Sequence, residues 1–281
     1  RSDIGPPPAC ADFVPLRQPP QGGTPCGPAK PVPRVFAHGL LRGLQSSSSG
    51  DRRYSSLPIS THDTMNAPTR DIYTEPSDVD FDTLRNLGPL TRMAGVWEGT
   101  RGLDVKPKAE GPKKQAFVER ISLQPIDPVT NGPQLLYGLR YHTHITKPGL
   151  AKTYHEQVGF WLWEPATSTV MHTLTIPRGQ TAMAGGTVAP DAAHFELTAT
   201  QGLETWGICS SPFLNEAFRT TAFRIAVTYN DDGTWGYEED TVLQILGQAE
   251  PFHHTDRNLL RKVEEPTPNP LVRPQATPAA A

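Results

Sequence analysis

Residues 219–246 read RTTAFRIAVTYNDDGTWGYEEDTVLQIL, and they give the clearest indication of the fold. Apolar and polar residues alternate on both sides of the turn-forming run Asn230-Asp231-Asp232-Gly233. A period of two is typical of a strand with one buried face, and an Asp-Gly pair favours a tight hairpin turn. The stretch therefore predicts two antiparallel strands, 219–230 and 234–246.

The same texture extends from about Asp80 to Val263. Asp80 to Gly88 opens with an aspartate and closes with a glycine, which predicts a short helix. Tight turns at Asn131-Gly132-Pro133 and Lys147-Pro148-Gly149 separate strand-like runs rich in β-branched and aromatic residues. The eight further predicted strands are 93–101, 115–124, 134–145, 152–163, 168–176, 180–188, 193–200 and 253–263.

Ten strands joined mostly by short turns predict an all-β fold, a ten-stranded antiparallel up-and-down β-barrel with a short N-terminal helix. A β-sandwich is the alternative. A closed barrel of ten strands is too wide for side chains alone to fill, so the fold itself predicts an internal ligand.

Proline divides the chain into three parts. Residues 1–64 hold 11 of the 30 prolines and a run of four serines, which predicts a disordered Pro/Ser-rich extension. The first methionine is Met65, and we expect the protein proper to begin there. Residues 80–265 form the predicted barrel domain, and residues 266–281 form a predicted disordered tail.

Composition excludes several classes of protein. The chain carries 26 Lys+Arg against 29 Asp+Glu, without the basic excess of a nucleic-acid-binding protein. It has no apolar run near the roughly 18 residues that a membrane span needs, so we expect a soluble cytoplasmic protein with no membrane partner. Three cysteines are too few for a disulfide framework, and Cys209 is expected to be a buried small apolar residue.

Three histidines form the first candidate site. His142 and His144 lie two residues apart on one predicted strand, so both side chains point to the same face. Together with His155 they could make a three-histidine metal site that activates water. The other interpretation is that they are hydrogen-bonded or solvent-facing strand residues.

A tryptophan between glycines marks the first predicted strand, which begins Gly95-Val96-Trp97-Glu98-Gly99. The two-residue spacing places both glycines on the same face as Trp97. Such glycines leave room for a large flat group or for a close backbone approach. A core tryptophan beside a bend in the strand explains the same pattern.

Adjacent histidines mark the last predicted strand, at His253 and His254. Neighbouring strand residues face opposite ways, so only one of the two can point into the barrel. An imidazole inside an apolar barrel needs a partner for its nitrogen, which a hydrogen bond, a metal or a heme iron can supply.

With both motifs, the chain resembles the nitrobindin family of heme-binding β-barrels, which are similar in shape to fatty-acid-binding proteins. The resemblance runs from about Gly88 to Val263. The features that carry it are Gly-x-Trp-x-Gly at 95–99, Leu136-Tyr137, the run His155-Glu156-Gln157-Val158-Gly159-Phe160, and the closing histidine followed by Leu259 and Arg261.

The resemblance implies a barrel that holds ferric heme b on a histidine near the start of the last strand. His254 precedes Leu259 by five residues and Arg261 by seven, as the family pattern requires, so His254 is the predicted axial ligand of the iron and His253 is the reserve. The remaining predicted heme-contacting residues are Gly95, Trp97, Gly99 and Lys108.

The family is credited with isomerising peroxynitrite to nitrate and with binding nitric oxide. These small molecules are therefore the implied ligands, no catalytic residue is assigned, and a homodimer is compatible with the resemblance. The alternative function is a heme-free carrier or sensor of an apolar ligand such as a fatty acid.

The chain departs from the family pattern at three places. A third glycine is expected two residues after Gly99, but Arg101 stands there and the glycine follows at Gly102. The loop from Lys108 to Lys114 is longer and more polar than expected. An insertion at about 201–218 has no counterpart in the family.

Overall fold

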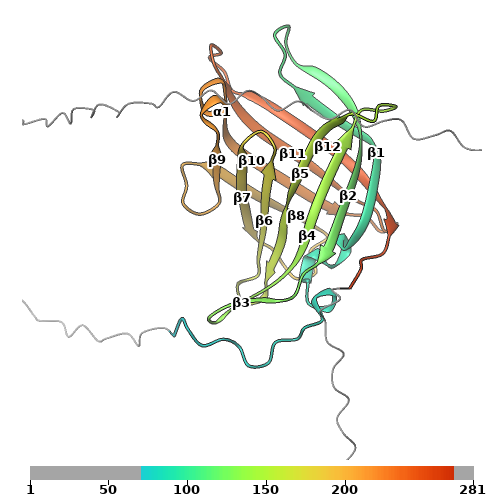
Figure 1. Ribbon diagram of the computed structural model, residues 1–281, viewed down its shortest axis with the longest axis vertical. Coiled ribbons are helices and arrows are strands. Elements are labelled where there is room, and N and C mark those ends of the chain that lie inside the picture. The colour runs from blue at the N-terminus through green and yellow to red at the C-terminus, as the bar shows by residue number, and fades with distance from the viewer. Residues whose placement is uncertain (1–70, 269–281) are drawn as a thin grey trace, which may run out of the picture. The chain divides into compact units, whose positions relative to one another are not determined.

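The computed structural model describes residues 71–268 (Figure 1), so the predicted extension 1–64 and most of the predicted tail lie outside the described residues. Twelve strands make up the domain: β1 Gly95–Lys106, β2 Lys113–Pro125, β3 Val129–Asn131, β4 Gln134–Thr146, β5 Thr153–Glu164, β6 Thr169–Ile176, β7 Gln180–Thr187, β8 His194–Gln201, β9 Gly207–Ser210, β10 Phe218–Tyr229, β11 Trp235–Ile245 and β12 Phe252–Glu264. One α-helix, α1 (Pro212–Ala217), and three 3-10 turns complete the fold.

The predicted all-β barrel is confirmed. The sheet runs in the order β2-β1-β12-β11-β10-β8-β9-β7-β6-β5-β4-β3, and pairing of β2 with β4 closes it. Eleven strands take part in the barrel, and β3 lies outside it, paired with β4 alone. The count exceeds the predicted ten because β3 and β9, of three and four residues, are too short to show a period in the sequence.

The insertion adds the strand β9 to the barrel wall and packs Trp206 against Gly185. Strand β9 lies between one end of β7 and β8, which otherwise pair only through Gly185 and Thr198. The ring of Trp206 covers Gly185, where an added Cβ would lie 2.5 Å from it. Cys209 is exposed on β9, so the prediction that it is buried was wrong. The neighbouring Ile208 packs against the core, so alternation along β9 turns Cys209 outward.

The predicted helix 80–88 is two 3-10 turns instead, Thr83–Arg85 and Gly88–Met93. Gly88 has a positive φ of 53°, which breaks the helical path, and a Cβ there would lie 2.5 Å from the Trp163 ring. The second turn closes the lower end of the barrel in Figure 1. Leu87, Leu90 and Met93 are completely buried there.

The core occupies this closed end. Trp97 and Trp235 meet edge to face with ring centroids 6.0 Å apart, and the Trp97 indole donates a hydrogen bond to the Met93 carbonyl at 2.8 Å. Burial of several large aromatic side chains supplies most of the stabilising free energy in such a core. The β1–β2, β4–β5 and β11–β12 hairpins lie at the opposite, open end (Figure 1).

A β-bulge in β1 reverses which residues face inward. Gly99 pairs with Glu119 of β2, but Gly102 pairs with Phe117, so three steps on β1 match two on β2. The pairing of β1 with β12 carries the same extra residue. Because of this bulge, Trp97 and Gly99 face inward before it, while Gly102, Asp104 and Lys106 face inward after it.

Candidate functional site at the open end of the barrel

His254 lies on the inward face of β12, near the open end. Leu260 and Asn258 share this face and are buried, whereas His253 points outward and its side chain is 59% exposed. The Nδ1 atom of His253 lies 2.7 Å from a carboxylate oxygen of Asp240. The structure therefore separates the two candidate histidines, as alternation along a strand requires.

A buried carboxylate orients His254. Its Nε2 lies 2.8 Å from Oδ1 of Asp104, which is 150 residues away in the sequence and 5% exposed. The hydroxyl of Tyr154 donates a short hydrogen bond to the other oxygen of Asp104, and Lys106 Nζ lies 3.8 Å from that oxygen. These four side chains come from β1, β5 and β12.

The protonation of this group follows from its contacts. Burial raises the pKa of the Asp104 carboxyl, but hydrogen bonds from His254 and Tyr154 outweigh it, so the pKa lies below its usual value. An ionised Asp104 can only accept hydrogen bonds, so Nε2 of His254 carries the proton. In the neutral imidazole, Nδ1 then keeps its lone pair, and no hydrogen bond engages Nδ1 within residues 71–268.

The β1 bulge makes the pairing of Asp104 with His254 possible. Strict alternation along β1 from Trp97, without a bulge, would turn Asp104 outward. Gly102 takes the inward position that the family pattern gives to the residue two after Gly99. An added Cβ at Gly102 would lie 2.2 Å from the Phe117 ring, so the close packing of that ring requires glycine.

Three carboxyl groups line the barrel below His254. Glu119 is fully buried and accepts hydrogen bonds from Tyr237 at 2.8 Å and Asn258 at 2.9 Å. Burial raises the pKa of Glu119 to about 7, because the two neutral donors only partly replace its hydration. Glu239 and Asp256 lie directly opposite one another on β11 and β12, and burial raises the pKa of each.

A second buried histidine lies farther inside. His172 stacks on Trp161 with centroids 3.9 Å apart, and its Nε2 lies 3.0 Å from the Tyr141 hydroxyl. Burial lowers the pKa of His172 to about 3, so the ring is neutral at physiological pH. Gln157 donates to the same hydroxyl at 2.7 Å. His172, Trp161, Tyr141 and Gln157 therefore form one stacked and hydrogen-bonded cluster.

The remaining predicted heme contacts are spread along the barrel. Trp97 is 1% exposed in the core at the closed end, and the Cβ position of Gly95 is 2.7 Å from the carbonyl oxygen of Glu264. At Gly99 that position is 2.3 Å from the Asn258 side chain. Lys108 is exposed on the β1–β2 hairpin at the same end as His254. Their predicted contact with heme stays a prediction.

The alternative three-histidine metal site is not formed. His142 and His144 face outward, where His142 meets Glu156 at 3.0 Å and His144 meets Thr153 at 2.9 Å. His155 faces inward, and burial lowers its pKa. No group of three metal-binding side chains occurs among residues 71–268. The metal site fails because the first two histidines and the third belong to opposite faces of the wall. His142 and His144 are instead hydrogen-bonded, outward-facing strand residues, as the other interpretation has it.

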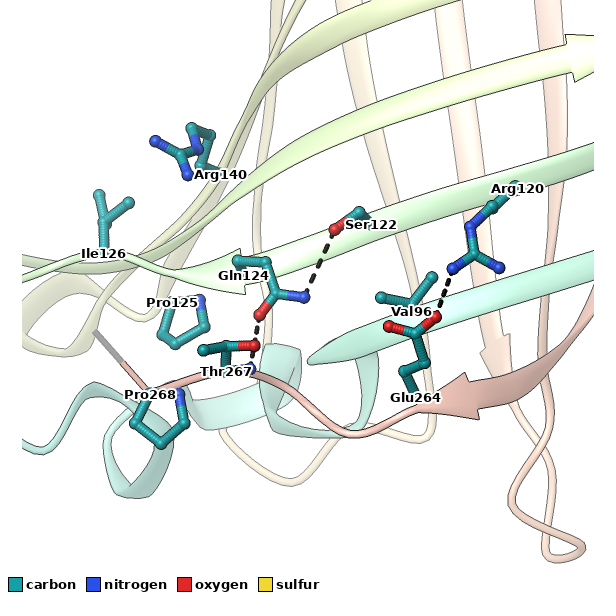
Figure 2. Close-up of a pocket in the computed structure, with 10 residues that line it drawn as sticks. All are labelled: Val96, Arg120, Ser122, Gln124, Pro125, Ile126, Arg140, Glu264, Thr267 and Pro268. Carbon is teal, nitrogen blue, oxygen red and sulfur yellow. Dashed lines mark hydrogen bonds and ion pairs between the residues drawn. The ribbon is translucent and has the colours of Figure 1, made fainter. Parts of the chain in front are cut away.

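A groove of about 540 Å³ lies on the outer wall (Figure 2). Arg120 bridges Glu98 and Glu264 at its rim, both at 2.5 Å. Gln124 accepts a hydrogen bond from the backbone of Thr267 at 2.7 Å. Thr267 and Pro268, which follow β12, lie along this groove.

Sequence reasoning missed most of the residues around His254. Asp104, Tyr154 and Glu119 each stand alone in the sequence, without a motif that marks them. A cue existed for Asp104, since the displaced glycine at Gly102 indicates an added residue in the strand. The arrangement as a whole offers one histidine held by a carboxylate, with a free ring nitrogen at the open end.

That donor set fits a heme iron. A histidine that ligates a metal usually gives its other N–H to a carboxylate or carbonyl, which fixes its tautomer and ring orientation. His254 and Asp104 have this relationship, and the His254 side chain is 31% exposed and thus reachable from the open end. His253 faces outward, so its side chain cannot contact a group inside the barrel.

One comparison with known proteins shows the family to which the chain belongs. The family described as THAP4-like, heme-binding beta-barrel domain matches residues 86–262, and the chain belongs to this family. The nitrobindin resemblance is therefore confirmed. A solved structure, Rv2717c from M. tuberculosis, has 21% identity and a TM-score of 0.46, covering 66% of this chain and 100% of its own. No curated protein matches the chain.

None of the helices within residues 71–268 is long and apolar enough to cross a membrane.

Proposed function

We propose that the protein binds heme b at the open end of the barrel, with His254 as the axial ligand of the iron, and acts on peroxynitrite and nitric oxide. The pairing of His254 with Asp104 is the observation that carries this proposal. Membership of a heme-binding family supports the cofactor, and the geometry of the pair supports the choice of ligand.

Each residue of the group has a distinct role. Asp104 holds the imidazole proton at Nε2, so the lone pair of Nδ1 stays available to the iron. Tyr154 and Lys106 in turn hold Asp104 in its ionised form. When bound, a ferric heme supplies a Lewis-acidic iron to which an anionic oxygen or nitric oxide binds. Lys106 and the predicted contact Lys108 place positive charge beside an incoming peroxynitrite anion.

A spectroscopic titration tests the proposal. Hemin added to the full chain should give a Soret band that saturates at one heme per chain. His254→Ala should abolish the band, and His253→Ala is the matched control, because it removes an adjacent imidazole that faces outward. Retention of the band in His254→Ala would assign the iron to another residue.

Positioning by Asp104 has its own readout. Asp104→Asn should weaken heme binding by about 10- to 100-fold, the usual cost of losing a carboxylate behind a metal-binding histidine. Faster decay of peroxynitrite with an increased nitrate yield, measured by stopped flow, tests the reaction itself. If wild-type protein binds no hemin, native mass spectrometry for a co-purified apolar ligand tests the carrier alternative.

A further inference from the structure

Two hairpins at the open end are strongly basic. The segments 106–114 and 147–152 contain six lysines and a single acidic residue, Glu110. They connect β1 to β2 and β4 to β5, and both project from the open end of the barrel (Figure 1). We call this surface the lysine rim. Its lysines are Lys108, Lys113, Lys114, Lys147 and Lys152, with Lys106, whose side chain is 16% exposed, at its inner edge.

The lysine rim is not explained by ion pairing. Only Lys106 lies near a carboxylate, that of Asp104, and the other five lysines make no ion pair with any described residue. Lys106 and Lys113 stand directly opposite one another on β1 and β2. Like charges in that arrangement destabilise a sheet, so folding alone does not account for them.

Tyr154 joins the two hairpins into one surface. The ammonium groups of Lys106 and Lys147 lie 4.3 and 5.3 Å from the centroid of its ring. Burial lowers the pKa of Lys106, and repulsion from Lys147, Lys108 and Lys113 adds to this effect against the opposing attraction of Asp104. The lysines therefore act on one another across the gap between the hairpins.

An apolar side chain stands at the tip of the second hairpin. Leu150 is 57% exposed, and it follows Pro148-Gly149 in a tight turn in which Gly149 has a φ of 74°. Lys147 and Lys152 flank it. An exposed leucine between lysines on a projecting turn combines the two features that peripheral attachment to a bilayer requires, apolar insertion and cationic contact.

We propose that the lysine rim, with Leu150 at the tip of its second hairpin, docks the open end of the barrel on the surface of an anionic phospholipid bilayer. Charge complementarity supports this choice: the two hairpins together carry six positive charges and one negative, although the whole chain has a net charge of -3. A soluble polyanion would satisfy the lysines but has no use for Leu150. Peripheral docking needs no spanning segment. The expectation of no membrane partner was based on the absence of such a segment, so it does not bear on this kind of contact.

Vesicle co-sedimentation of the full chain without hemin tests the proposal. The protein should pellet with phosphatidylcholine vesicles that contain about one third phosphatidylserine, but not with phosphatidylcholine alone. Raising the salt from about 0.1 M to about 0.5 M should release it, because the shorter screening length weakens the lysine contacts. Equal binding to both kinds of vesicle, or none to either, would overturn the proposal.

Three variants separate the contributions. Lys113→Gln with Lys114→Gln should weaken binding by about 25-fold, at about fivefold for each lysine near an anionic surface. Leu150→Ser should weaken binding several-fold and leave the salt dependence unchanged. The matched control is Arg85→Gln, which removes an exposed cation at the closed end and should leave binding unchanged.

The choice of a bilayer over a soluble polyanion depends on Leu150. If heparin binds the wild-type chain as tightly as the anionic vesicles do, and Leu150→Ser binds both unchanged, the rim recognises a polyanion and the bilayer assignment is wrong. A circular dichroism spectrum equal to that of wild type shows that each variant is folded, so a loss of binding reports on the surface itself.

Discussion

The two ends of the barrel are built from the same strands but bury different side chains. The closed end buries Trp97, Trp235 and the turn Gly88–Met93; the Trp97 indole donates to the Met93 carbonyl, whereas the Trp235 indole N–H has no partner among residues 71–268. The open end places Asp104 and His254 on the inward face, with lysines around the rim. The two ends therefore differ in the kind of side chain that they bury, so changes at the two ends should have different effects on stability and on its dependence on pH.

The largest effect is expected at the closed end. Trp97→Ala should lower the free energy of unfolding by about 4 kcal/mol, because it empties a fully buried site and leaves the Met93 carbonyl without its donor. Chemical denaturation measures the change. Tyr154→Phe at the open end is the control, since it removes one hydroxyl and no core volume. Equal losses in both variants would erase the division between the two ends.

A carboxyl between the ends should give a pH signature. The pKa of Glu119 is raised from 4.5 to about 7 in the folded protein, so its contribution to stability is most favourable below about pH 4.5 and declines as pH rises to about 7. Glu119→Gln should remove this decline and stabilise the protein by about 3 kcal/mol at pH 8, with no gain at pH 4. If the free energy of unfolding did not change with pH in either the wild type or Glu119→Gln, the assignment of a raised pKa to Glu119 would be contradicted.

The bulge in β1 lies between the two ends of the barrel, and an added methyl group at Gly102 tests how closely it is packed. Gly102→Ala should destabilise the protein by about 2 kcal/mol, because the new methyl group meets the Phe117 ring at 2.2 Å. Phe117→Leu in the same chain should restore part of the loss by making space. A Gly102→Ala variant as stable as wild type would mean that the ring is free to move aside.

The smallest expected effect on stability is at the open end. The pKa of Asp104 is lowered, so its stabilising contribution is present above the unfolded pKa of about 4 and disappears as pH falls through the folded value. Asp104→Asn should therefore cost about 1 to 2 kcal/mol at pH 7 and little at pH 2. This pH dependence has the opposite sign to that of Glu119, and the same sign in both would break the comparison.

The sequence predicted the barrel wall well, because alternation along strands such as 219–230 depends only on neighbouring residues. It missed α1 even though Ser211-Pro212 is a typical helix start, since six residues show no helical period. His254 was found through a family pattern, but its partner Asp104 could not be, because the two residues meet only after the barrel closes. The position of Gly102 departs from the family pattern in the sequence itself. That it marks a bulge is visible only from the pairing of β1 with β2 and β12.

The bulge in β1 has a consequence for how this chain tolerates insertion and deletion. An added residue in a strand ordinarily turns everything beyond it inside out, which would expose one face of the core. Here the surplus is absorbed at Thr100-Arg101, and the neighbouring strands β2 and β12 keep a common register beyond it. One residue can therefore be added to or removed from β1 at this point without changing which later side chains face inward. Relatives that differ by one residue here can share the same inward-facing groups.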